Sequence, residues 1–148
     1  MKAVVQRVKK TTLKVDEEII STIPFGLTVF LGVQGGDTTA QADYIAKKIA
    51  GLRIFEDENG KMNLSVQDVG GEILLVSQFT LLGDTSHGNR PSFTLAERPE
   101  KAKSLYEYTV SAVEKYGITV KTGVFGADMQ IEQHNDGPVT ILIESPLK

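Results

Sequence analysis

Residues 26–33, Gly-Leu-Thr-Val-Phe-Leu-Gly-Val, are apolar over most of their length, which predicts a strand at the centre of a sheet. Upstream, residues 3–8 and 12–15 read as a pair of strands, and residues 18–21 read as another. The first part of the chain is therefore expected to build a sheet around residues 26–33.

A helix is predicted just after the double glycine that follows this strand, because Asp37 or Thr38 can cap its first turn. Apolar residues then recur at steps of three and four along the segment, at Ala42, Ile45, Ile49 and Leu52. This spacing gives the helix one apolar face, so we expect it to cover a face of the sheet.

A second amphipathic helix is predicted from Pro99 to about Tyr116, with Gly117 as its stop. Further strands are expected at residues 52–55 and 61–64, joined by an Asn59-Gly60 turn, and at residues 73–76, 118–121, 128–132 and 139–143. Two helices among many strands indicate an α+β fold. We expect a curled antiparallel or mixed sheet with a barrel-like core and both helices packed outside.

The composition favours one globular domain over residues 1–148, since 41% of the 148 residues are hydrophobic and no linker or repeat interrupts them. No apolar run is long enough to span a bilayer, and the opening lacks a signal-peptide pattern, so a soluble cytoplasmic protein is expected. The chain contains no cysteine, which excludes a disulfide framework, a thiolate nucleophile and a cysteine-ligated zinc site. A net charge of −3 argues against broad adhesion to nucleic acid but leaves a local contact possible.

Familiar catalytic motifs are missing from the chain. There is no nucleophile elbow, phosphate-binding loop, dinucleotide fingerprint or zinc-protease helix. The two histidines, His87 and His134, read as solvated side chains, and they cannot make a three-histidine metal site. The Gly123–Gly126 segment matches a short loop of one RNA-binding module, but an ordinary turn explains it better. We therefore predict no metal and no cofactor.

Two polar runs beside predicted strands are the most informative part of the sequence. Ser77-Gln78-Phe79-Thr80-Leu81 follows the apolar strand at residues 73–76, and Asn135-Asp136-Gly137-Pro138-Val139-Thr140 leads into the strand at residues 139–143. Glycine lets a backbone approach a ligand closely, while proline fixes φ and makes a cis peptide accessible. The two runs are expected to be two walls of a pocket.

These two runs resemble the signature motifs of the D-aminoacyl-tRNA deacylases. Other segments that look like family sequence, in family order, are residues 1–8, 53–55, 88–93 and 123–129. The resemblance implies a homodimeric editing enzyme that hydrolyses the ester joining a D-amino acid, or glycine, to the terminal adenosine of tRNA. Its partners would be a second copy of the chain and the acceptor end of aminoacyl-tRNA.

The resemblance also implies roles for individual residues. Ser77, Gln78, Phe79 and Thr80 would form the catalytic side of the site, and Asn135, Gly137, Pro138, Val139 and Thr140 would bind substrate and select its chirality. The Gly137-Pro138 peptide would be cis and would reach from one subunit into the active site of the other. A rigid backbone near the α-carbon would collide with an L side chain and admit hydrogen, so D-residues and glycine would pass.

Catalysis is expected to be assisted by the substrate. Thr80 is a nucleophile candidate by residue type, yet no neighbouring base is evident in the sequence. The 2′-hydroxyl of the terminal ribose lies next to the ester and can take part or position water. Backbone N–H groups near Phe79 and Thr80 could stabilise the oxyanion, with Thr80 as a positioning residue.

Alternatives to this reading are a non-catalytic barrel that binds RNA or adenosine, and a general esterase that uses Thr80 or Ser77 with His134. Arg7, Arg53 and Arg90 could contact tRNA phosphates or could form surface ion pairs. Esterase activity that ignores chirality would separate the general esterase from the editing enzyme, and an absence of ester cleavage would indicate the binding barrel.

Overall fold

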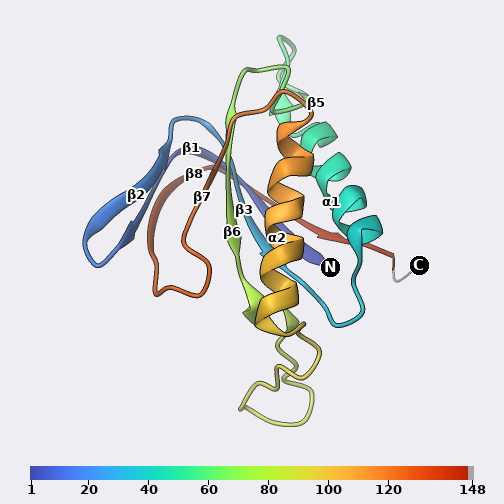
Figure 1. The fold of residues 1–148 in the computed structure, drawn as a ribbon. Coiled ribbons are helices and arrows are strands. Elements are labelled where there is room, and N and C mark those ends of the chain that lie inside the picture. The colour runs from blue at the N-terminus through green and yellow to red at the C-terminus, as the bar shows by residue number, and fades with distance from the viewer. Residues whose placement is uncertain (147–148) are drawn as a thin grey trace.

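The computed structural model describes residues 1–146, which form one mixed sheet, a small hairpin and two helices (Figure 1). In chain order the elements are β1 (Lys2–Val15), β2 (Glu18–Ile23), β3 (Gly26–Gly32), α1 (Thr39–Gly51), β4 (Phe55–Glu56), β5 (Met62–Leu64), β6 (Glu72–Ser77), the 3₁₀ turn η1 (Phe79–Leu82), α2 (Pro99–Glu114), β7 (Val120–Thr122) and β8 (Gln130–Glu144).

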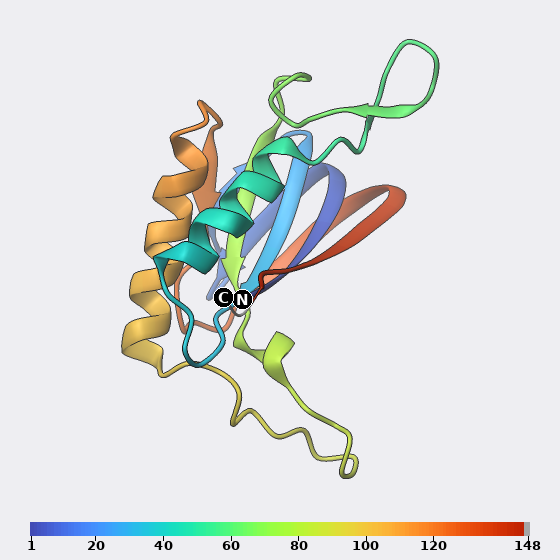
Figure 2. The same cartoon turned by 90° about the vertical axis from the view of Figure 1, so that its right-hand side faces the viewer.

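The main sheet has the strand order β2-β1-β3-β6-β7, and β8 pairs with β1. Strand β6 is parallel to β3 and to β7, while the pairs that involve β1 are antiparallel. The two parallel connections each contain one helix, because a chain that re-enters a sheet in the same direction needs a crossover. Both helices therefore lie on the same side of the sheet (Figures 1 and 2). The predicted α+β fold, with a curled mixed sheet and two helices outside it, is confirmed, and β3 is central as expected.

Alternation along the strands divides the core into two clusters. Side chains on one face of β3 and β6, such as Val29 and Leu75, are fully buried against the helices. On the opposite face, a smaller cluster contains Val8, Leu13, Ile23, Leu74 and Val76. Strand β2 covers this second cluster and curls towards β7, where Lys121 Nζ donates to the Thr22 carbonyl at 2.8 Å. The curl gives the core its barrel-like shape.

The helices begin where the sequence predicts. Thr38 caps α1, and a capping box joins it to Gln41, since each side chain bonds the other residue's backbone. Pro99 opens α2, which ends at Glu114 close to the predicted stop. The hairpin at Asn59-Gly60 is also present, with strands of only two and three residues.

In two places, two separately expected strands belong to one long strand. Residues 3–8 and 12–15 were expected to pair with each other, but they belong to the continuous β1. The strands expected at residues 128–132 and 139–143 similarly fall at the two ends of β8, which begins at Gln130, so that residues 128–129 precede it. The β1–β8 register shifts between Gln6 and Val8 and again between Val8 and Lys10. These irregularities bend both strands, so one strand serves two parts of the sheet.

Polar contacts, some of them buried, tie the loops at one end of the sheet together. The Met1 ammonium lies 2.9 Å from Asp37 Oδ2 and donates to Ser145 Oγ at 3.0 Å. Asp37 also accepts a hydrogen bond from the Gln34 N–H at 2.7 Å. The Gly35 N–H in turn donates to the Leu95 carbonyl at 2.8 Å. The segment before α2 is thereby held against the end of β3.

No helix within residues 1–146 is long and apolar enough to cross a membrane.

Tyr106 links α2 to the sheet and makes the free energy of unfolding depend on pH in the alkaline range. Its hydroxyl donates to the Leu75 carbonyl at 2.6 Å, and burial raises the pKa of the phenol to about 12. The unfolded value is about 10. Because the folded pKa is the higher one, the protonated phenol contributes its full stabilisation below about pH 10, and this contribution is lost as pH rises towards 12.

We therefore expect wild type and Tyr106→Phe to differ in the pH dependence of unfolding. Between about pH 10 and 12, the free energy of unfolding of wild type should fall relative to Tyr106→Phe, by at most ~1.4 kcal/mol per pH unit. Denaturant titrations at several pH values measure the difference. Parallel curves over that range would contradict the burial of the phenol.

Candidate active site

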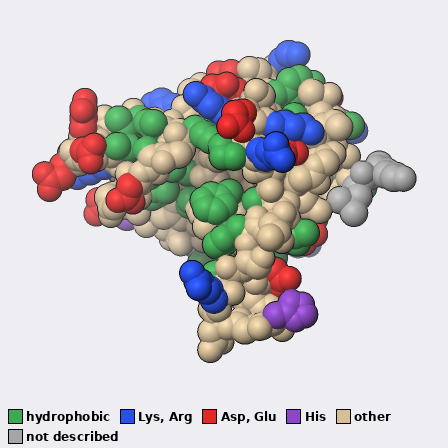
Figure 3. All heavy atoms as spheres, turned by 60° about the horizontal axis from the view of Figure 1, so that its bottom comes forward, with side chains coloured by type: hydrophobic (Ala, Val, Ile, Leu, Met, Phe, Trp, Pro, Cys, Tyr) green, Lys and Arg blue, Asp and Glu red, His purple; other side chains and the backbone are tan. Residues whose placement is uncertain are grey.

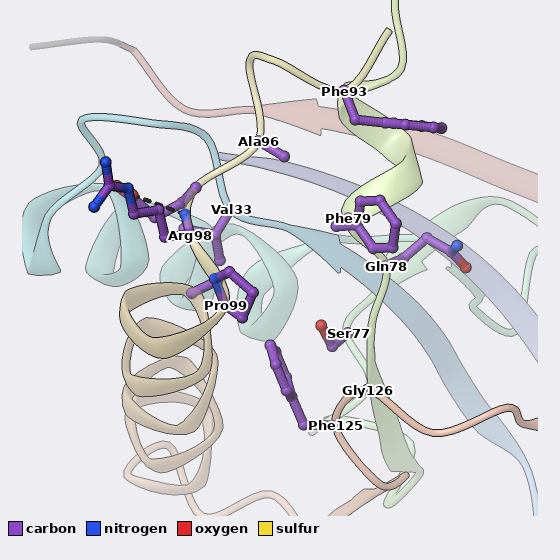
Figure 4. A pocket seen from close by; sticks show the side chains of 12 residues that line it. Val33, Ser77, Gln78, Phe79, Phe93, Ala96, Arg98, Pro99, Phe125 and Gly126 are labelled. Carbon is purple, nitrogen blue, oxygen red and sulfur yellow. Dashed lines mark hydrogen bonds between the residues drawn. The ribbon is translucent and has the colours of Figure 1, made fainter. Parts of the chain in front are cut away.

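A cavity of about 530 Å³ opens at the carboxyl end of β6, between the sheet and the start of α2 (Figure 4). It is lined by Val33, Ser77, Gln78, Phe79, Phe93, Ala96, Glu97, Arg98, Pro99, Ala102, Phe125 and Gly126. Most of these side chains are apolar, and the few polar groups come from β6 and from the segment before α2. Such a cavity suits a ligand with an apolar or aromatic body. Figure 3 shows hydrophobic side chains exposed on the face seen from below, with Lys, Arg, Asp and Glu side chains around them.

The run that begins at Ser77 enters this cavity because β6 ends there. Ser77 is the last residue of β6, and the Gln78 N–H still bonds the Leu31 carbonyl at 2.8 Å. The chain then turns through η1, which leaves Phe79 56% exposed at the cavity rim. The Phe79 ring meets Phe93 edge to face, with their centroids 5.2 Å apart. Two aromatic rings held at a rim form a surface for a planar ligand.

Thr80 lies in the same turn, yet it is not among the residues that line the cavity. Its Oγ1 accepts a hydrogen bond from Gln78 Nε2. An amide N–H is a donor and cannot remove a proton from a hydroxyl. The neighbour of Thr80 in the structure is therefore not a base that could activate it.

Glu97 is the acidic side chain of the cavity lining. Its carboxylate accepts hydrogen bonds from the Arg98 and Gly36 N–H groups at 2.9 and 3.3 Å. The Arg98 N–H is the main cause of a lowered pKa of Glu97, and Lys101 adds to it. The Glu97 carboxylate stays charged at neutral pH, so it is better suited to accept a hydrogen bond from a ligand than to deliver a proton.

The second polar run lies within β8. Gly137 and Pro138 are exposed, and the peptide bond between them is cis. Gly137 has φ +126°, and a Cβ added to it would lie 2.9 Å from Val139 Cγ2, so only glycine fits there. Asn135 and Thr140 flank the dipeptide with exposed side chains, whereas Val139 is buried. The run thus presents main chain and small groups on the surface.

The two runs do not meet within one chain. The cavity lining includes no residue from 135–140. The bend of β8 lies opposite Arg7 of β1. Arg7 pairs with Leu27 of β3, and Leu27 pairs with Ile73 of β6, so the bend is level with Ile73 across the sheet. Ser77 is four residues further along β6, or ~13 Å, and β6 is three strand spacings from β8, or ~14 Å. If the runs are walls of one pocket, two chains must supply them.

Arg7 is buried, and this setting differs from both alternatives considered for it, a contact with a tRNA phosphate and a surface ion pair. Only 6% of it is exposed. Its NH1 donates to the Ile54 carbonyl at 2.7 Å, and its Nε donates to the Asp136 carbonyl at 3.2 Å and lies 3.4 Å from Asp136 Oδ2. The guanidinium therefore holds the bend of β8 and is buried away from a phosphate. Arg53 and Arg90 are both exposed, and Arg53 bonds the Asn63 side chain and carbonyl.

Several lining residues had no signal in the sequence. Val33, Glu97, Arg98 and Ala102 come from segments that read as strand end, loop and helix face. Residues 123–126 form a turn closed by the Ala127 N–H on the Val124 carbonyl, as predicted. Phe125 of this turn nevertheless lines the cavity, and its ring lies 6.0 Å from Tyr106. Only the packing of α2 against β7 brings them together.

Neither histidine reaches the cavity. His134 lies on β8 opposite Lys10, and His87 is exposed in the loop after η1. Among residues 1–146, no group of three or more His, Asp or Glu side chains could hold a metal ion. Neither histidine of the chain therefore lies with Ser77 in the cavity lining.

Solved structures share this fold over nearly the whole chain. A protein named c-Myc DNA Unwinding Element Binding Protein has a TM-score of 0.93 and 45% identity, over 99% of each chain. A probable eukaryotic D-amino acid tRNA deacylase has a TM-score of 0.83 with 16% identity, over 96% of this chain and 97% of that chain. At such low identity the second likeness concerns the fold alone. The fold is thus that of a class which includes a probable tRNA deacylase.

Sequence comparison gives the particular family. A family model described as D-Tyr-tRNA(Tyr) deacylase matches residues 4–144. Two relatives named D-aminoacyl-tRNA deacylase come from Koribacter versatilis, with 57% identity over 98% of this chain and 97% of the relative, and Geotalea uraniireducens, with 53% identity over 99% and 94%. The chain belongs to the D-Tyr-tRNA(Tyr) deacylase family. The family and the enzyme class predicted from the sequence are confirmed.

Proposed function

We propose that this protein edits tRNA in the cytoplasm by hydrolysing the ester of D-aminoacyl-tRNA, and of glycyl-tRNA, to free tRNA and amino acid. The observation that carries the proposal is the cavity at the end of β6, which contains the family-like run Ser77-Gln78-Phe79. Its volume of about 530 Å³ is adequate for an aminoacyl-adenosine. The aromatic rim at Phe79 and Phe93 is suited to an adenine or an aromatic side chain.

The active form is a homodimer in which each subunit supplies one wall of its partner's site. The separation of Gly137-Pro138 from the cavity of its own chain supports this arrangement. An apolar surface near this segment is also exposed. Leu142 is 73% exposed, and its neighbours across the sheet on the same face are Val4 and Phe30, which are both half-buried. This face is opposite the helices, and an exposed apolar patch of this kind marks an interface.

Chirality is selected by exclusion. When the amino group and the ester of the substrate are held, the side chain of an L-residue points where the α-hydrogen of a D-residue lies. Gly137 and Pro138 offer a wall of main chain and ring that has no side chain able to rotate away. Arg7 holds this wall through the Asp136 carbonyl at 3.2 Å. A wall of this kind leaves space for hydrogen only, so glycine also enters.

Hydrolysis depends on the 2′-hydroxyl of the terminal ribose. Thr80 accepts a hydrogen bond from the Gln78 amide, which is a donor and not a base, and this favours a positioning role. The N–H groups of Phe79 and Thr80 begin a 3₁₀ turn, where backbone donors have no acceptor within the turn. They are suited to bind the oxyanion while the 2′-hydroxyl positions or activates the attacking water.

A general esterase that pairs Ser77 with His134 is disfavoured. His134 is on β8, next to the segment that does not reach the cavity of its own chain. A non-catalytic barrel that binds adenosine would use the same cavity and differs only in leaving the ester intact.

The central prediction concerns chirality. D-Tyrosyl-tRNA and glycyl-tRNA should lose their esters at least ~100-fold faster than L-tyrosyl-tRNA, because only the L side chain meets the wall. Release of labelled amino acid measures the rates. Equal rates for the D and L esters would indicate a general esterase, and no release from any of them would indicate a binding protein.

A second prediction separates the role of Thr80 from that of the ribose. Thr80→Ala should retain activity within roughly 10-fold of wild type, while a D-aminoacyl-tRNA that ends in 2′-deoxyadenosine should lose ~100-fold or more. Single-turnover rates measure both effects. Loss of activity in Thr80→Ala together with full cleavage of the deoxy substrate would instead make the threonine hydroxyl the nucleophile.

A third prediction concerns the dimer. Leu142→Glu should shift the protein to monomers and abolish deacylation while the monomer stays folded, because the side chain is 73% exposed in a single chain. Ile19→Glu is the matched control, since Ile19 is also exposed, at 59%, but lies in β2 on the outer hairpin. Light scattering and activity should change only for Leu142→Glu. An active monomer would refute a site shared between subunits.

A further inference from the structure

The outer surface of α1 carries a cavity whose lining is cationic. This cavity, of about 450 Å³, is lined by Tyr44, Lys47, Lys48, Gly51, Leu52 and Arg53. The lining thus includes three cations and no carboxylate, in a chain whose net charge is −3. We call Lys47, Lys48 and Arg53 the basic patch.

The charges of the basic patch are available to a ligand. All three residues are exposed, and none of them forms an ion pair with any of residues 1–146. Lys48 Nζ lies 5.7 Å from the centre of the Tyr44 ring, which keeps the ammonium over the cavity without neutralising it. Arg53 Nε bonds the Asn63 carbonyl at 2.9 Å, so its guanidinium is oriented by a neutral group.

Helix α1, which carries the lysines of the basic patch, is linked at both ends to β8, the strand that carries Gly137 and Pro138. At one end of α1, Gln41 Nε2 donates to the Pro146 carbonyl at 3.4 Å, just after β8. At the other end, Arg7 bridges the Ile54 carbonyl and the Asp136 carbonyl, at 2.7 and 3.2 Å. Figure 2 shows the chain leaving α1 towards the bend of β8. Arg53, at the end of the patch, is thus one residue from Ile54, which Arg7 links to the bend of β8.

We propose that the basic patch binds phosphates at the acceptor end of a tRNA whose terminal adenosine occupies the partner's cavity. This inference rests on the proposed function and on its shared site. If Gly137 and Pro138 of one subunit form a wall of the partner's cavity, the patch on the same subunit is carried to the mouth of that cavity. Each subunit then supplies its partner with a wall for the amino acid and charges for the RNA.

The chemistry of the patch fits a phosphodiester chain. Two ammonium groups and one guanidinium around a shallow cavity can neutralise successive phosphates without reading bases. Such contacts release counterions, and for single-stranded nucleic acid each one adds about 0.7 to the slope of log affinity against log salt. An acidic protein that needs one end of one RNA gains a local contact in this way without general adhesion to nucleic acid.

The first test uses Lys47→Gln/Lys48→Gln, which leaves Arg53 and its bond to Asn63 in place. The KM for D-tyrosyl-tRNA should rise while kcat is kept. Between about 50 and 200 mM salt, the affinity of wild type should fall roughly 7-fold more than that of the variant, as expected for two phosphate contacts. With D-tyrosyl-adenosine, which has no phosphate, the KM of the variant should equal that of wild type.

The matched control is Lys103→Gln/Lys115→Gln, which removes the same charge from two exposed lysines, Lys103 in α2 and Lys115 just after it. Its KM and salt dependence should equal those of wild type. Equal KM values for the two variants, or an equal loss with D-tyrosyl-adenosine, would overturn the inference. Failure of wild type to cleave D-tyrosyl-tRNA would instead refute the proposed function, so the two failures are distinguishable.

Mixed dimers test whether the patch acts on the partner. One subunit carries Gln78→Ala/Phe79→Ala, chosen as a variant that is inactive as a homodimer, and the other carries Lys47→Gln/Lys48→Gln. The intact cavity then faces an intact patch across the dimer, and we expect the KM of wild type. Placing all four substitutions on one subunit, beside a wild-type subunit, should give the raised KM. The reverse pattern would show that the patch serves its own subunit and would overturn the inference.

Discussion

The buried guanidinium of Arg7 is the contact on which the arrangement of this molecule depends. It joins the Ile54 carbonyl, after α1, to the Asp136 carbonyl in β8, at 2.7 and 3.2 Å. A buried charge is costly unless its donors are satisfied, so this contact forms only when both segments are in place. The planar fork of arginine reaches two carbonyls at once, which a lysine ammonium on the same stem would not reproduce. Arg7 therefore fixes where Gly137 and Pro138 face outward.

The cavity at the end of β6 depends on a different set of contacts. Its walls come from segments distant in sequence, which are joined by the Met1 ammonium, Asp37 and the bond from the Gly35 N–H to the Leu95 carbonyl. The Met1 ammonium and Asp37 are buried and pair with each other, and together with the bond between Gly35 and Leu95 they hold the segment before α2. Phe93 then lies against Phe79, and Pro99 begins α2 at the cavity edge. The site is a meeting point of loops supported by a rigid sheet.

The two polar runs, at Ser77 and at Gly137-Pro138, lie apart in one chain, and this separation explains how the proposed enzyme would work as a dimer. One chain holds a cavity for the esterified adenosine, and a second chain would supply the stiff main chain that rejects an L side chain. Chiral rejection needs a surface that does not yield, and a backbone held by Arg7 yields less than a side chain with free rotamers. The basic patch, which ends one residue from the contact of Ile54 with Arg7, would travel with the same wall. Amino-acid selection and RNA binding would then be coupled through one dimer contact.

The sequence by itself determined the element types, the central strand, both helix starts and the family, because capping residues, periodicity and motifs are local signals. It led to wrong boundaries for β1 and β8, where bends of one strand look like the ends of two. The burial of Arg7, the entry of Phe125 and Glu97 into the cavity, and the distance between Ser77 and Pro138 were decided only by the tertiary structure. Each of these follows from pairings between residues far apart in the chain. No local sequence pattern specifies which strands lie side by side, and the strand order and register set the distance between the two motifs.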